Sequence, residues 1–152
     1  MGNRAVITSY VEGENFGKKH SNRIGIYVHW NGGYDSVSAF LKFCEIKGFR
    51  YPEQDSYGWA RLCQVIANYF GGEGLSVGID TINHLDLDNG DNGVFLIKEW
   101  KIVGRAYNGD DEQKEYKLLD MLKGIDNAQP KDMKITTEEW KEYKKKDIVQ
   151  ED

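Results

Sequence analysis

Two patterns of hydrophobic residues follow one another in the segment from residue 23 to residue 48. The first alternates every second position through Ile24, Ile26, Val28 and Trp30. This period is typical of a half-buried strand. The second recurs at helical spacing through Val37, Phe40, Leu41 and Cys44. We therefore expect a strand, a glycine turn at residues 31–33 and a helix that Asp35 or Ser36 caps and Gly48 ends.

Further strands are predicted on both sides of this unit. Residues 4–10 read as an opening strand, followed by a polar loop over 11–22, and residues 75–80 form a short strand weakened by glycine. Residues 94–98 and 100–107 form a hairpin that turns near Glu99. The 94–98 strand is apolar on both faces, so we expect it to be central or to meet a partner, which invites a homodimer.

Helical spacing predicts three more helices. One begins near Asp55 or Ser56 and ends at Gly71, and one spans residues 112–126. The third follows Thr136, which forms a capping-box pattern with Glu139. The order of elements indicates an α+β fold: a mainly antiparallel sheet of about five strands with helices packed largely on one face. We expect one α+β domain over residues 1–130 and a polar C-terminal helix and tail over 131–152.

Composition places the chain among ordinary globular proteins. It has 152 residues, of which 39% are hydrophobic and 30% charged, enough to bury one core without metals or disulfides. The sequence shows no apolar run of membrane-spanning length and no secretory signal, so we expect a cytoplasmic protein with no membrane partner. Cys44 and Cys63 lie on apolar helix faces, where reduced core thiols are expected.

The charge is unevenly distributed along the chain. Residues 1–50 carry a balance of +3, so the net charge of −5 leaves −8 for residues 51–152. A nucleic-acid-binding protein would normally show a clustered basic face. The charge therefore argues against direct binding of nucleic acid.

The sequence contains partial matches to a hydrolase motif and a calcium-binding loop, but neither match is complete. Residues 74–78 match the G-x-S-x-G pattern of hydrolases, but no helix follows the serine. The acidic loop, residues 86–93, is rich in aspartate, but its glycine is fifth rather than sixth and Ile97 stands where a calcium loop has glutamate. No pair of His or Cys residues has ligand spacing, so we expect neither a protein-bound metal nor a cofactor.

Candidate binding residues are therefore chosen by residue type and by expected exposure. Residues 31–33 resemble an anion-binding glycine turn before a helix, but a structural turn is favoured because the lysine of a phosphate loop is absent and Asp35 would repel phosphate. Tyrosines without an obvious place in the core are typical of recognition surfaces. The predicted ligand- or partner-binding residues are Tyr27, His29, Asn31, Tyr34, Asp86, Asp88 and Asp91. No catalytic set is assembled.

Four stretches carry a resemblance to a known family. Residues 2–8 (GNRAVIT), 25–33 (GIYVHWNGG), 57–62 (YGWARL) and 91–94 (DNGV) resemble a family of small, functionally uncharacterised proteins of gut Firmicutes and their phages or mobile elements. The likeness covers about residues 1–130. It implies no mechanism and no catalytic residues. It implies a context in which small accessory proteins often bind and antagonise host defence systems.

Three hypotheses follow. The first is a non-enzymatic binding protein of a phage or mobile element, an inhibitor of the anti-CRISPR kind that binds a host defence nuclease or sequesters its nucleotide signal. The second is a small hydrolase or nucleotide-processing enzyme that uses His29 with Asp35 or with the acidic loop. The third is a structural or regulatory module whose partner is encoded nearby.

Overall fold

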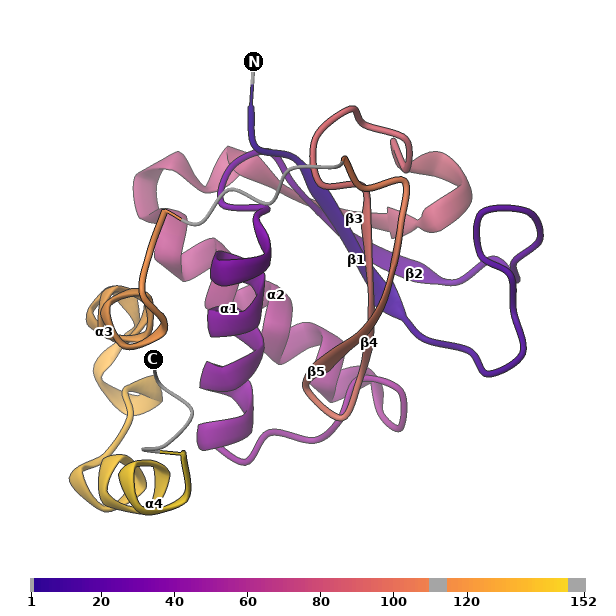
Figure 1. Ribbon diagram of the computed structural model, residues 1–152. Helices are drawn as coiled ribbons and strands as arrows, with labels where there is room; N and C mark the ends of the chain where they lie inside the picture. Colours follow the sequence, from indigo (N-terminus) through magenta and orange to yellow (C-terminus); the bar gives the residue numbers. More distant parts are fainter. Residues whose placement is uncertain (1, 110–114, 148–152) are drawn as a thin grey trace.

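The computed structural model of the chain describes residues 2–109 and 115–147. In these residues, five strands form one mixed sheet in the order β3-β2-β1-β4-β5 (Figure 1). β1 and β4 are parallel, and the other neighbouring strands are antiparallel. The strands are β1 (Ala5–Ser9), β2 (Ile24–Val28), β3 (Val77–Thr81), β4 (Val94–Lys98) and β5 (Lys101–Ala106). The α+β class and the mostly antiparallel sheet predicted from the sequence are confirmed.

The helices lie on one side of the sheet, also as predicted. The helices are α1 (Tyr34–Ile46), α2 (Ser56–Phe70), α3 (Leu118–Ala128) and α4 (Thr137–Asp147). Short 3-10 helices are η1 (Gly71–Ser76), η2 (Ile82–His84) and η3 (Lys131–Met133). α1 and α2 pack on the sheet, and α3 and α4 lie on the outer side of α1 (Figure 1). None of the helices in the described ranges is long and apolar enough to cross a membrane.

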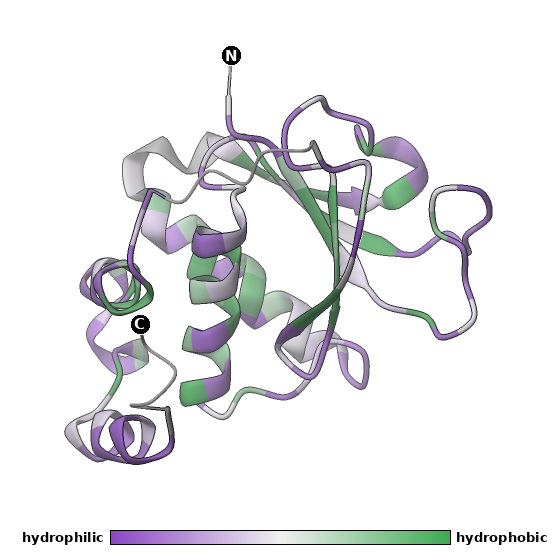
Figure 2. Cartoon of the chain, in the orientation of Figure 1, coloured by the Kyte–Doolittle hydropathy of each residue, from purple (hydrophilic) through white to green (hydrophobic). Residues whose placement is uncertain are grey.

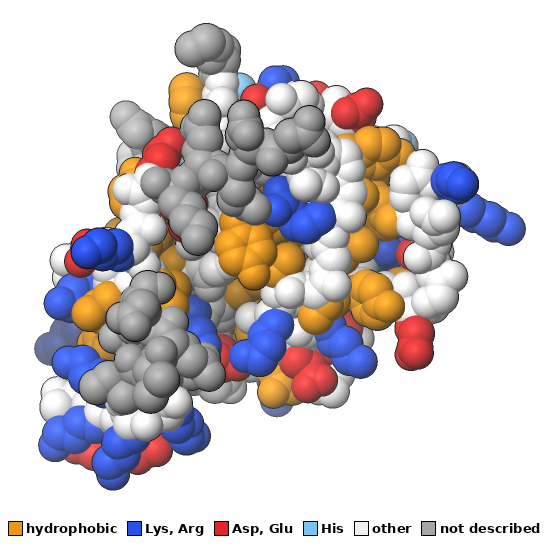
Figure 3. Space-filling model, viewed as in Figure 1, with side chains coloured by type: hydrophobic (Ala, Val, Ile, Leu, Met, Phe, Trp, Pro, Cys, Tyr) orange, Lys and Arg blue, Asp and Glu red, His pale blue; other side chains and the backbone are white. Residues whose placement is uncertain are grey.

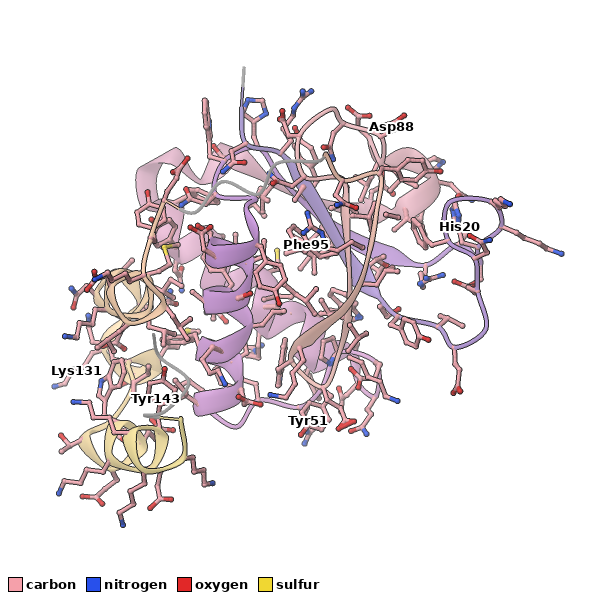
Figure 4. The ribbon with its side chains drawn as sticks, viewed as in Figure 1. His20, Tyr51, Asp88, Phe95, Lys131 and Tyr143 are labelled. Carbon is pink, nitrogen blue, oxygen red and sulfur yellow. The ribbon has the colours of Figure 1, made fainter. Side chains whose placement is uncertain are left out.

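Two apolar clusters cover the two faces of the sheet. The larger cluster lies between the sheet and the helices and contains Phe95 and Ile97 of β4, together with the buried side of α1 (Figures 2 and 4). The smaller cluster lies on the other face, where Val94 and Leu96 pack with Phe16 of the β1–β2 loop. β4 is therefore a central strand with both faces covered inside the chain. A homodimer is not needed to bury it.

The β4–β5 hairpin turns at Glu99 and Trp100, as predicted. Both residues have left-handed backbones, with φ of 52° and 62°, which a two-residue hairpin turn requires and which side chains normally disfavour. Trp100 is buried, and its indole N–H donates to the carbonyl of Phe49 at 2.9 Å. Burial of this large ring stabilises a turn that would otherwise favour glycine.

The start of α1 differs from the prediction, whereas the start of α2 agrees with it. Asp55 caps α2 by accepting the Tyr57 amide at 2.8 Å. α1 begins at Tyr34 after Gly33, which makes no side-chain cap. Asp35 therefore lies inside the first turn, and its carboxylate accepts hydrogen bonds from the segment before α3. Gly48, in the left-handed region at φ 70°, follows α1 as expected.

The third helix was predicted too long at its start. Residues 112–114 lie outside the described residues, and α3 begins only at Leu118. Glu115 and Tyr116 precede it because their amides donate to Asp35, at 2.7 Å and 2.9 Å, rather than to helical carbonyls. At the other end α3 continues past Gly124 to Ala128 and stops before Pro130.

β3 also begins later than predicted, because residues 75 and 76 belong to η1.

α4 is fixed by the predicted capping box. The Glu139 amide donates to Thr136 Oγ1 at 3.1 Å, and the Thr136 amide donates to Glu139 Oε1 at 2.9 Å. Tyr143 points from α4 into the interior, where it joins the larger cluster (Figure 4). The outer surface around α4 carries basic and acidic side chains side by side (Figure 3).

Candidate functional site

The strand directions bring five chain segments to one end of the sheet. β1, β3 and β4 begin at this end, whereas β2 and β5 finish there, because β1 and β4 are parallel and the other pairs antiparallel. The residues just before or just after each strand therefore meet at this end, although they are far apart in the sequence. It is the upper end of the sheet in Figure 1.

A polar, open cleft of about 1070 Å³ lies at this end, a size near the upper limit of about 1,000 Å³ that is usual for small-molecule sites. Its described lining combines aromatic rings, amides and carboxylates. The lining residues are Gly2, Asn3, Trp30, Asn31, Tyr69, Phe70, Ser76, Gly90, Asp91, Asn92, Gly109, Glu115 and Tyr116. None of these lining residues is a lysine or an arginine.

The turn after β2 forms one wall of the cleft. Asn31 has a left-handed backbone at φ 56°, which asparagine tolerates better than most residues. The next amide, of Gly32, donates to the carbonyl of Asn3 at 2.8 Å, and a Cβ on Gly32 would lie 2.4 Å from that oxygen. The glycine thus allows the backbones of the two segments to touch. These contacts are structural, in keeping with the turn favoured from the sequence.

Aromatic rings from three elements line the cleft. Trp30 is 46% exposed and Tyr116 is 41% exposed, whereas Tyr69 packs edge-to-face on Phe70, with ring centres 5.5 Å apart. Burial raises the pKa of Tyr69, Tyr116 adds to this rise, and a hydrogen bond with Asn31 opposes it. The partly buried Tyr69 therefore joins Asn31 and Tyr116 in the wall of the cleft.

An ion pair joins β1 to the acidic loop at the edge of the cleft. Asp91 Oδ2 accepts the Arg4 amide at 3.1 Å and Arg4 Nε at 2.7 Å. The hydrogen bond from the Arg4 side chain is the main reason why the pKa of Asp91 is lowered. A second carboxylate, of Asp86, lies 4.0 Å from the same guanidinium. Arg4 is thus engaged by acidic side chains of this chain.

The acidic loop is organised by the buried side-chain amide of Asn89. Asn89 Nδ2 donates to the carbonyls of Asp86 and Gly93, and its Oδ1 accepts the amides of Asp91 and Gly93, at 3.0–3.2 Å. These are the contacts of an asparagine-centred turn. Across the described ranges, no three His, Cys, Asp or Glu side chains are grouped so as to hold a metal ion.

Tyr27 and His29 form a pair beside the cleft. The Tyr27 hydroxyl and His29 Nδ1 are hydrogen-bonded at 3.0 Å, and the His29 ring meets Trp30 edge-on at 5.1 Å. Burial raises the pKa of Tyr27, Arg4 opposes this, and Asp86 and Asp91 add to the rise. The pair therefore lies close to the ion pair of the acidic loop.

The structure brings some of the predicted site residues together and separates others. Asn31 and Asp91 line the cleft. Tyr27 and Asp86 lie near Arg4 at its edge, and His29 is hydrogen-bonded to Tyr27. Tyr34 does not line the cleft; its ring lies 6.3 Å from that of Phe95. Asp88 lies exposed on the outer side of the acidic loop (Figure 4). The residues that sequence reasoning missed are Trp30, Tyr69, Glu115 and Tyr116.

The serine of the G-x-S-x-G match lies in the cleft wall but not in a nucleophile elbow. Ser76 ends a 3-10 helix and leads into β3, whereas the elbow requires a strand followed by a helix. Its carbonyl accepts the His29 amide at 2.8 Å, which ties β3 to the end of β2. The rejection of this motif from the sequence therefore agrees with the geometry.

Comparison of the chain with protein-family models, with curated proteins and with solved structures finds no match.

Proposed function

We propose that the protein is a non-enzymatic binding protein of a phage or mobile element, and that it inhibits a host defence nuclease by binding the basic surface on which that nuclease holds nucleic acid. The observation that carries the proposal is the cleft. Exposed aromatic rings of Trp30 and Tyr116 stand there beside the carboxylates of Asp91 and Glu115, and its described lining has no lysine or arginine. Such a surface suits a cationic partner.

The charge of the chain supports the same kind of partner. Residues 51–152, which supply most of the lining, carry a balance of −8. A protein that holds nucleic acid presents lysine and arginine to phosphates. Carboxylates can compete with phosphates for those cations, and complementary charge also speeds the encounter of the two proteins.

A nucleotide signal is the less favoured ligand of this cleft. Phosphate groups are usually met by arginine, lysine or free backbone amides. The guanidinium of Arg4, at the edge of the cleft, already pairs with Asp91 at 2.7 Å and lies 4.0 Å from Asp86. The carboxylates of the lining would repel phosphate.

One observation favours the rival function, a small hydrolase or nucleotide-processing enzyme. Tyr27 and His29 are hydrogen-bonded at 3.0 Å next to the acidic loop, and such a pair could move a proton. Asp35, the other carboxylate considered, instead accepts the amides of Ser36, Glu115 and Tyr116. Its contacts are those of a structural anchor.

The test is a binding screen with the purified chain. Surface-bound protein is exposed to a panel of defence nucleases, their effector complexes and cyclic nucleotides, and native mass spectrometry records stoichiometry and any self-association. We expect saturable binding to a basic effector that weakens as salt rises, with nuclease activity inhibited and no nucleotide consumed. No affinity for any member of the panel would refute the proposal. Nucleotide turnover that His29→Ala abolishes would establish the rival.

A further inference from the structure

We infer that the cleft binds an arginine side chain of the partner, an inference that rests on the proposed function. The described side chains of the lining offer hydrogen-bond acceptors with negative charge and exposed ring faces. A guanidinium carries five N–H donors in a plane, a delocalised positive charge and a flat face that stacks on aromatic rings. It matches both features at once.

The carboxylates of Asp91 and Glu115 have oxygens that accept no hydrogen bond from the described residues. Both bonds from Arg4 to Asp91 end on Oδ2, and among the described residues no hydrogen bond uses Asp91 Oδ1. The Glu115 side chain likewise forms no hydrogen bond or ion pair with the described part of the chain, although its backbone is fixed to Asp35 at 2.7 Å. Two anionic acceptors on anchored backbones are therefore left for an external donor.

The exposed rings are held in place by neighbours. Trp30 meets His29 edge-on at 5.1 Å and remains 46% exposed. The backbone of Tyr116 is fixed through its amide, which donates to Asp35 at 2.9 Å, and its side chain is hydrogen-bonded to that of Tyr69. A cation over a tryptophan or tyrosine face gains attraction from the ring quadrupole. Fixing the rings in advance lowers the entropy lost on binding.

Arginine fits this lining better than lysine does. A lysine ammonium is a compact, strongly hydrated point charge, which loses more hydration on entering a cleft and cannot stack as a plane. The cleft volume of about 1070 Å³ leaves room beside one arginine side chain, and the partner in the proposed function is a protein. The ligand class is therefore an arginine-containing peptide segment of a protein.

Peptide titrations followed by NMR test the inference. The probes are acetyl-Gly-Arg-Gly-amide, its lysine counterpart and its citrulline counterpart, which keeps the shape of arginine without the charge. The chain has four tryptophans, and the spectrum of Trp30→Phe identifies the Trp30 indole signal. We expect the arginine peptide to shift that signal and the Tyr116 amide in a saturable way. The citrulline peptide should bind at least about tenfold more weakly than the arginine peptide.

Variants sharpen the test. Glu115→Gln should weaken the arginine peptide about fivefold or more, whereas Glu138→Gln, an exposed carboxylate of α4, serves as the matched control and should not change its affinity. Equal binding of arginine and citrulline, no effect of Glu115→Gln, or a cleft response to cyclic nucleotides instead would overturn the inference.

The two proposals can fail separately. If no peptide shifts the cleft signals but a defence effector still binds the chain, the arginine site is wrong and the proposed function stands. If the arginine peptide binds in the cleft but no effector in the panel binds the chain, the ligand class stands and the proposed function is wrong.

Discussion

Asp35 in the first turn of α1 accepts a hydrogen bond from the backbone amide of Tyr116, at 2.9 Å across 81 residues of sequence. The same oxygen accepts the Glu115 amide at 2.7 Å. One carboxylate thus holds the segment that brings a ring and an acid to the cleft. A helix N-terminus favours a negative charge at this position, so the anchor is also well placed electrostatically.

Removing this anchor should loosen the cleft more than the fold. Asp35→Ala leaves the amides of Glu115 and Tyr116 to water, because both residues are exposed, so we expect the free energy of unfolding to fall by only about 1 kcal/mol. Hydrogen exchange at those two amides should accelerate clearly. Asp88→Ala, which removes an exposed carboxylate of the acidic loop, is the control. Unchanged exchange at Tyr116 in Asp35→Ala would contradict the anchor.

Asn89 should be the most sensitive position of the acidic loop. Its amide makes four hydrogen bonds to backbone groups, and it is 3% exposed, so Asn89→Ala leaves buried donors and acceptors unpaired. We expect a loss of about 2–3 kcal/mol in the free energy of unfolding, measured by urea denaturation. Asn83→Ala, at an exposed asparagine, should cost far less. Equal losses for the two variants would contradict the loop architecture.

The close approach of Gly32 to Asn3 predicts a steric effect. A Cβ at this position would lie 2.4 Å from a backbone oxygen, so Gly32→Ala forces the first segment away from the turn. We expect it to lower stability by about 1–3 kcal/mol. Gly78→Ala, in a strand with open space around it, should be neutral or slightly stabilising. Thermal unfolding of the two variants compares them directly, and a stable Gly32→Ala would show that the segments are not in contact.

Acid should weaken the link between Arg4 and the acidic loop. The hydrogen bond from Arg4 lowers the pKa of Asp91 in the folded chain. The stability that this bond contributes is therefore present above the unfolded pKa of an aspartate, about 3.9, and is lost as the pH falls through the lower folded value. Between pH 7 and pH 2.5, Asp91→Asn should lose less stability than the wild type does. Asp88→Asn should lose as much as the wild type, and equal losses in all three proteins would contradict the ion pair.

Local patterns in the sequence were sufficient for most of the fold. The strand period around Ile26, the hairpin at Glu99 and the capping box at Thr136 depend on neighbours within a few positions, and the structure confirms each of them. The start of α3 was misjudged because it depends on Asp35, 80 residues away from Glu115. No local pattern carries that contact.

The cleft was only partly predictable for the same reason. Asn31 and Asp91 were chosen as exposed polar residues of turns. Trp30 continues the alternating pattern of β2, so the sequence placed it among the positions of a half-buried strand, and Tyr69 was not singled out. The chain leaves strand geometry after Val28 and becomes left-handed at Asn31, which places Trp30 outside the sheet. An aromatic residue next to an Asn-Gly-Gly turn was the one local signal of this exposure.

Amide hydrogen exchange of the protein in complex with a defence effector from the panel tests the central claim most directly. We predict that the complex protects the amides of residues 30–31, 91–92 and 115–116 from exchange relative to the free chain, and that amides of α4 and the outer edge of β3 exchange as before. Protection confined to α4 or to β3, with the cleft amides unchanged, would contradict the claim that this cleft is the recognition surface.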